Sequence, residues 1–151
     1  MSVQSVTPVL NVSSVGQSFE WFEVLGWRRG FSWNDNGMIG SGANALGANE
    51  HGEAGFGSVC SGKAEIFLCC GGQGSRGTIL PKFPGDDQTD GVWMSWWMQS
   101  PADVDQLHAL AVQHGMIVTY PPTNEPWGVR EFPLRHPDGH MFRVSSGLSE
   151  E

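Results

Sequence analysis

The stretch that decides the fold of this 151-residue chain runs over residues 127–144, with the sequence WGVREFPLRHPDGHMFRV. Two runs of alternating apolar residues flank the turn sequence His136-Pro137-Asp138-Gly139. Proline presets the φ angle of an early turn position, and glycine accepts the positive φ that closes a turn. The Asp-Gly pair between two such runs therefore predicts a β-hairpin, and the proline indicates a connection longer than two residues.

Working outward from this hairpin, the chain shows the same order of elements twice. Hydrophobic periodicity and stop signals predict a strand, a helix and three further strands in each half. In the first half we expect them at residues 6–12, 14–25, 27–33, 54–60 and 63–70. In the second half we expect them at residues 91–99, 101–114 and 116–120, followed by the two strands of the hairpin.

Both predicted helices carry start signals and one apolar stripe. Ser14 and Ser100 are suited to cap helix N-termini, and Pro101 occupies the favoured first helical position. The apolar residues that follow are spaced to fall on one helix face. They are Val15, Phe19 and Phe22 in the first helix and Val104, Leu107 and Ala111 in the second.

Two segments lack such signals. Residues 34–53 are mostly glycine, asparagine and small residues, which predicts a loop that is mobile or functional. Residues 71–90 are predicted to be a linker. The glycine-rich run at residues 71–77 lacks the Gly-Lys-Ser/Thr ending of a phosphate-binding loop, so phosphate binding there is not expected.

The composition indicates a soluble, turn-rich globular protein. Hydrophobic residues make up 39% of the chain, and the formal net charge is −8. Such an acidic chain is a poor partner for nucleic acid, and no apolar run is long enough to cross a membrane. The cysteines Cys60, Cys69 and Cys70 do not form a disulfide framework. We therefore expect a cytoplasmic protein with free thiols and with neither nucleic-acid nor membrane partners.

The residues around the hairpin carry a family resemblance. The run from Pro126 to Phe132, PWGVREF, followed by Asp138-Gly139 and a final apolar strand, resembles the vicinal oxygen chelate superfamily. This superfamily includes glyoxalase I, extradiol dioxygenases and bleomycin-resistance proteins, and the resemblance is to the bleomycin-resistance branch.

The resemblance implies an α+β fold built from two βαβββ modules, whose mixed strands curl into a cup around the site. The chain is then a single domain, residues 1–151, with module one at residues 5–71, a linker at 72–90 and module two at 91–147. Members of this superfamily commonly pair, which implies a homodimer.

The resemblance also identifies where metal-using members place their four ligands. The matching positions of this chain are Thr7, Glu65, Trp93 and Arg143. A divalent cation needs several anionic or imidazole donors, and an arginine would repel it. We therefore expect no metal and no cofactor. The histidines, including His136 and His140 beside the turn, are expected at the surface or in loops.

Strand alternation predicts which side chains would line the cup. If Trp93 points inward, Trp97 does so as well, while Trp96 faces the helices. Aromatic walls suit a planar or cationic ligand. The candidate ligand-binding residues are Thr7, Phe31, Trp33, Glu65, Phe67, Trp93, Ser95, Trp97 and Arg143.

Three functions stay open at this point. The first is a metal-free binding protein for a small aromatic or cationic molecule, such as an antibiotic. The second is a metal-dependent lyase, isomerase or dioxygenase of the same superfamily, so whether the chain is an enzyme is left undecided. The third is an interaction protein whose cup is filled by its own side chains. In the metal-free form we also expect an ion pair between Glu65 and Arg143, because a buried carboxylate must be compensated.

Overall fold

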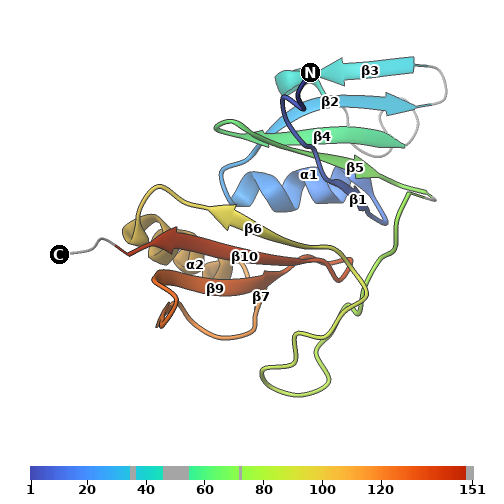
Figure 1. Ribbon diagram of the computed structural model, residues 1–151. Helices are drawn as coiled ribbons and strands as arrows, with labels where there is room; N and C mark the ends of the chain where they lie inside the picture. The colour runs from blue at the N-terminus through green and yellow to red at the C-terminus, as the bar shows by residue number, and fades with distance from the viewer. Residues whose placement is uncertain (35–36, 46–54, 72, 149–151) are drawn as a thin grey trace. The chain divides into compact units, whose positions relative to one another are not determined.

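A computed structural model describes residues 1–34, 37–45, 55–71 and 73–148 of the chain (Figure 1). The chain divides into two compact units, Met1–Ser75 and Arg76–Glu151. Each unit contains one α-helix packed on one face of a mixed β-sheet, so the predicted α+β class is confirmed. Within the described residues, no helix is long and apolar enough to span a membrane.

The first unit contains a five-stranded sheet in the order β1-β5-β4-β2-β3, in which β1 is parallel to β5 and the other pairs are antiparallel. Helix α1 packs on this sheet through Val15, Phe19 and Phe22, all fully buried as the apolar stripe predicts. The elements are β1 (Val9–Asn11), α1 (Val15–Val24), β2 (Arg28–Asn34), β3 (Gly37–Ser41), the short 3₁₀ helix η1 (Gly42–Asn44), β4 (Phe56–Ser61) and β5 (Ala64–Cys69).

The second unit has a sheet in the order β6-β10-β9-β7, with the short strand β8 also paired to β9. Strand β6 is parallel to β10, and β9 is antiparallel to β7, β8 and β10. Helix α2 packs on β7, β9 and β10. The elements are β6 (Trp93–Trp97), α2 (Pro101–Gln113), β7 (Ile117–Val118), β8 (Thr123–Glu125), β9 (Val129–Arg135) and β10 (Met141–Gly147).

Both helices start at the predicted serine caps. The Ser14 hydroxyl accepts a hydrogen bond from the Gln17 amide at 3.1 Å, and the Ser100 hydroxyl accepts one from the Asp103 amide at 3.2 Å. Each cap satisfies an amide that has no partner within its helix. The strands and helices predicted from the sequence are all present, although several observed strands are shorter than predicted by a few residues.

The predicted loop at residues 34–53 is partly wrong, because its described portion contains β3 and η1. Strand β3 is antiparallel to β2, with Phe31 opposite Ser41 and Trp33 opposite Met38. Its residues, GMIGS, include one β-branched side chain and no aromatic one, so the usual sequence signal of a strand is weak. Residues 46–54 of the predicted loop, His51 among them, lie outside the described residues.

The predicted hairpin is present and its turn is covered by the preceding chain. Strands β9 and β10 are joined through residues 136–140, with the Gly139 amide donating to the His136 carbonyl at 2.9 Å. The Gly77 amide donates to the Asp138 carbonyl at 2.8 Å, and the Val92 amide donates to Nδ1 of His140 at 2.9 Å. The segment before β6 therefore folds over the hairpin turn.

Two histidines that we expected at the surface or in loops are buried beneath this segment. His136 is 1% exposed and His140 is fully buried, although both flank a turn. Burial and the neighbouring His140 lower the pKa of His136 to about 3. Nδ1 of His136 accepts the Asp138 amide hydrogen at 3.0 Å, which requires an unprotonated nitrogen. Its 3.9 Å separation from the Asp138 carboxylate is therefore not an ion pair.

Arg135 anchors this covering segment, residues 76–90, to the end of β9. It is 1% exposed, and its guanidinium donates to the carbonyls of Thr78 and Asp86. Residues 76–90 contain no helix or strand, yet they are anchored to the end of β9. A buried guanidinium requires such acceptors, because removing its charge from water without hydrogen bonds is very costly.

Candidate functional site

Strand alternation places Ser95, Trp96 and Trp97, three neighbours on β6, on two faces of the sheet. Trp96 is 7% exposed and stacks on Phe142, with ring centroids 4.5 Å apart. The next residue, Trp97, is 70% exposed, as the alternation of a strand requires. Ser95 lies opposite Arg143 and Trp97 opposite Ser145, so these four residues share the face away from α2.

A buried carboxylate lies on the neighbouring strand. Glu131 of β9 is 3% exposed and lies opposite Ser145. Its Oε1 accepts a hydrogen bond from Nη2 of Arg143 at 2.6 Å, and its Oε2 accepts one from the Ser145 hydroxyl at 2.8 Å. The hydrogen bond to Glu131 raises the pKa of Arg143. Both carboxylate oxygens are therefore engaged by side chains of β10.

A tight turn places a second exposed tryptophan beside this pair. The turn joins β8 to β9, and the Gly128 amide donates to the Glu125 carbonyl at 3.0 Å. Pro126 suits the second position of such a turn, and Gly128 has a φ of 87°. Trp127, between them, is 61% exposed. The Pro-Trp-Gly turn therefore holds the Trp127 indole ring at the surface.

These residues enclose a pocket of about 440 Å³ on the second unit. Its walls combine two exposed indoles with one charged pair and two hydroxyl groups. Among the described residues, neither Trp97 nor Trp127 has an aromatic ring partner. Its lining residues are Ser95, Trp97, Trp127, Val129, Glu131, Arg143 and Ser145.

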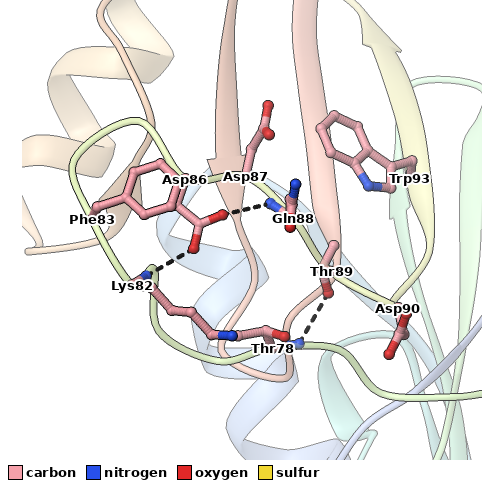
Figure 2. A pocket seen from close by; sticks show the side chains of 9 residues that line it. All are labelled: Thr78, Lys82, Phe83, Asp86, Asp87, Gln88, Thr89, Asp90 and Trp93. Atoms are coloured by element: carbon pink, nitrogen blue, oxygen red, sulfur yellow. Dashed lines mark hydrogen bonds between the residues drawn. The ribbon is translucent and has the colours of Figure 1, made fainter.

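A second cavity, also of about 440 Å³, lies between Trp93 and the covering segment (Figure 2). In it the Asp86 carboxylate accepts hydrogen bonds from the amides of Lys82 and Gln88, as the dashed lines in Figure 2 show. These two bonds lower the pKa of Asp86. The Asp86 carboxylate therefore organises the loop around it. The lining residues are Thr78, Lys82, Phe83, Asp86, Asp87, Gln88, Thr89, Asp90 and Trp93.

The structure brings three of the nine predicted site residues together in the first pocket, namely Ser95, Trp97 and Arg143. Trp93 is 43% exposed and lines the second cavity instead. The other five lie in the first unit: Thr7, Phe31, Trp33, Glu65 and Phe67.

Within the first unit, aromatic rings gather on the sheet. The rings of Phe31, Phe56 and Phe67 lie 5.3 to 5.7 Å apart, and all three residues are partly exposed. Trp33 is 45% exposed on the same strand as Phe31. Participation of these residues in a ligand site stays a prediction.

The expected partner of Arg143 needs correction. We expected an ion pair with Glu65, but the carboxylate bound to Arg143 is that of Glu131. Glu65 instead accepts a hydrogen bond from the Cys60 thiol at 3.6 Å, across the β4–β5 pair. Burial, followed by the charge of Glu65, raises the pKa of Cys60. Arg143 and Glu131 come from one hairpin, so local register supplies the compensating charge.

The donor chemistry at the positions implied by the resemblance does not fit a divalent cation. Thr7, Glu65, Trp93 and Arg143 supply one carboxylate among them. In the part of the chain that the structure describes, no group of three or more histidine, cysteine or acidic side chains could hold a metal ion.

Sequence reasoning missed Trp127, Glu131 and Ser145 as pocket residues. Trp127 belongs to the quoted hairpin stretch, and a tryptophan between proline and glycine in a turn is a usable signal of exposure. Ser145 could have been found by continuing the alternation of Arg143 along the last strand. Glu131 had no equivalent signal, because its burial depends on the β9–β10 register.

Comparison with known proteins agrees with this architecture. A family model described as the Glyoxalase/Bleomycin resistance protein/Dioxygenase superfamily matches residues 4–144. No curated protein matches the chain in a sequence search.

Solved structures resemble the chain over nearly its whole length. TioX from Micromonospora sp. ML1 has a TM-score of 0.63 at 15% identity, covering 98% of this chain and 99% of TioX. A bleomycin resistance determinant encoded on the transposon Tn5 has a TM-score of 0.59 at 15% identity, covering 96% and 98%. A bleomycin-binding protein complexed with bleomycin has a TM-score of 0.58 at 15% identity, covering 98% and 100%. At such identities the similarity establishes the fold.

Proposed function

Because the chain belongs to the glyoxalase/bleomycin resistance protein/dioxygenase superfamily, we propose that it is a small-molecule binding protein whose flat aromatic ligand occupies the Trp97–Trp127 pocket. The binding requires no metal, since the positions that would hold one carry a single carboxylate. The ligand is bound without being transformed, and an aromatic antibiotic is one candidate.

The observation that carries this proposal is the exposure of two tryptophans on one pocket. Trp97 is 70% exposed and Trp127 is 61% exposed, although tryptophan is among the side chains that gain most from burial. Exposed aromatic rings around a concave site, with a few fixed polar groups at its base, are typical of ligand pockets. Here the fixed polar groups are Glu131, Arg143 and Ser145.

The relatives support a binding function in general terms. One similar structure is a bleomycin-binding protein in complex with bleomycin, and another is a bleomycin resistance determinant. Those proteins share the fold at 15% identity, so the ligand of this chain is argued from its own pocket.

The proposal extends to assembly and location. A homodimer would bury exposed apolar side chains that the single chain leaves in water. The free cysteines Cys60, Cys69 and Cys70 suit a reducing compartment, which supports a cytoplasmic location.

Isothermal titration with 2-naphthalenemethanol, a neutral flat aromatic alcohol, tests the binding function. We expect saturable binding, and we expect Trp97→Ala and Trp127→Ala each to weaken it about tenfold through loss of ring contact. Phe83→Ala is the matched control, because Phe83 is 60% exposed but lines the other cavity. The proposal fails if the wild type does not bind, or if Phe83→Ala weakens binding as much as the tryptophan variants.

A further inference from the structure

The ion pair at the base of the pocket is asymmetric. The Glu131 side chain is 4% exposed, whereas the Arg143 side chain is 42% exposed. Both residues line the pocket, and the guanidinium is much the more exposed of the two charged groups. A ligand entering this pocket therefore meets more of the guanidinium than of the carboxylate.

The donors of Arg143 are only partly used. One hydrogen bond joins Nη2 to Glu131, and within the described part of the chain the Arg143 guanidinium makes no other hydrogen bond. A guanidinium carries five N–H donors in a planar fork, so donors remain for a ligand. The bond to Glu131 also fixes the orientation of that fork before any ligand arrives.

The remaining lining offers nothing that would attract a cation at this point. Both oxygens of Glu131 accept hydrogen bonds from Arg143 and Ser145. The other lining residues are neutral: Ser95, Trp97, Trp127, Val129 and Ser145. Of the acidic residues outside this lining, Glu125 also acts electrostatically on Arg143.

Ser95 adds a hydroxyl to the lining of the same pocket. It is exposed and lies directly opposite Arg143 in the β6–β10 register. No hydrogen bond engages its hydroxyl among the residues that the structure describes. A planar carboxylate accepts two parallel N–H donors from a guanidinium and can take a hydroxyl donor as well.

Resting on the small-molecule binding proposed above, we infer that the ligand is an aromatic carboxylate. Its ring lies against Trp97 and Trp127, and its carboxylate accepts hydrogen bonds from Arg143 and Ser95. Arg143 is then the residue that determines charge specificity, and Glu131 positions it. This narrows the choice between an aromatic and a cationic ligand to an aromatic anion.

Titration with three naphthalene probes of one ring size tests this inference. The probes are 2-naphthoate, neutral 2-naphthalenemethanol and cationic 2-naphthylmethylammonium. We expect the wild type to bind naphthoate about tenfold more tightly than the ammonium, as one charge-assisted contact supplies. Arg143→Gln should remove that preference, and it should weaken naphthoate binding by a larger factor than naphthalenemethanol binding.

Two further variants keep the test decisive if Arg143→Gln does not fold. Arg143→Lys retains the charge but loses the fork, so naphthoate affinity should fall by a smaller factor. Glu131→Gln keeps a side-chain oxygen that can accept the Arg143 hydrogen bond and removes only the compensating charge, so naphthoate affinity should stay or rise. Arg130→Gln is the matched control, because Arg130 lies on the neighbouring strand β9 and pairs with Asp105 of α2. It removes one positive charge and should leave all three affinities unchanged.

The outcomes separate the two proposals. If naphthalenemethanol binds but the ammonium binds as tightly as naphthoate, binding stands and the aromatic carboxylate is wrong. If Arg143→Lys and Arg143→Gln both keep the wild-type preference, Arg143 is not the specificity residue and the inference is overturned. If none of the three probes binds, the binding function itself fails, and this inference fails with it.

Discussion

Arg143 and Glu131 form a diagonal ion pair on neighbouring strands, with Nη2 and Oε1 2.6 Å apart. They are not direct cross-strand partners, because Arg143 lies opposite Pro133 and Glu131 lies opposite Ser145. The guanidinium reaches along the strand to the carboxylate, and of the two charged groups that line the pocket it is much the more exposed.

The difference in burial between Glu131 and Arg143 predicts unequal losses of stability when either side chain is replaced. Arg143→Ala leaves a buried carboxylate without its charge partner and should lower the free energy of unfolding by about 2 kcal/mol. Glu131→Gln leaves a half-exposed guanidinium that water can solvate, and it should cost about 1 kcal/mol or less. Urea unfolding at pH 7 measures both values. Equal losses would show that the burial of Glu131 does not set the energetics.

The buried His136 predicts a loss of stability in mild acid. Its pKa is about 3 in the folded chain, against the ordinary histidine value of 6.5 in the unfolded chain. Between these values the unfolded chain binds a proton that the folded chain does not, so the free energy of unfolding falls as the pH falls. The contribution of this group between pH 7 and pH 5 is about 2 kcal/mol.

The matching variant is His136→Asn, which does not titrate and can still accept the Asp138 amide hydrogen through its side-chain oxygen. We expect its unfolding free energy to depend less steeply on pH over the same interval. Urea unfolding at several pH values compares the two proteins. If the slopes coincide, the acid sensitivity comes from other groups.

The hairpin turn predicts contrasting effects of two glycine substitutions. Gly139 and Gly128 have φ angles of 85° and 87°. A Cβ at Gly139 would also overlap the backbone of Gly77, whereas a Cβ at Gly128 meets nothing within 4 Å. Gly128→Ala should therefore cost about 1–2 kcal/mol for its backbone conformation alone. Gly139→Ala should cost clearly more, and thermal unfolding of both variants tests the difference. Equal costs would mean that the segment around Gly77 moves away freely.

The proposed homodimer makes a simple prediction for mass. Light scattering at micromolar concentration should give twice the chain mass of 16.4 kDa. The physical reason is the exposed apolar surface, which includes Trp33 at 45% and Met38 at 60% exposure. A monomer mass under these conditions would contradict the dimer and leave the pocket proposal intact.

Local patterns predicted the parts of this structure that depend on neighbouring residues. Alternation along β6 was sufficient to separate buried Trp96 from exposed Trp97. The serine caps at Ser14 and Ser100 and the Asp-Gly turn were predictable because each is a short-range interaction. The order of elements followed from these signals together.

Most of the features that were predicted wrongly depend on contacts between residues that are distant in the sequence. His136 and His140 are buried by a segment that begins about 60 residues earlier, near Gly77, and no local pattern reports such cover. The partner of Arg143 was wrong for a related reason, since strand register decides which carboxylate it reaches. Strand β3 was missed because two glycines and a serine among its five residues resemble a loop.

The anchoring of Thr78 and Asp86 by Arg135 has a consequence for the order of folding. Arg135 ends β9, so its guanidinium reaches its final position only once the β9–β10 hairpin has formed. Residues 76–90 precede that hairpin in the chain, yet they have no helix or strand of their own to order them earlier. We therefore expect them to become ordered after the hairpin. In a pulsed hydrogen-exchange experiment during refolding, the Lys82 and Gln88 amides should gain protection later than the amides of β9 and β10.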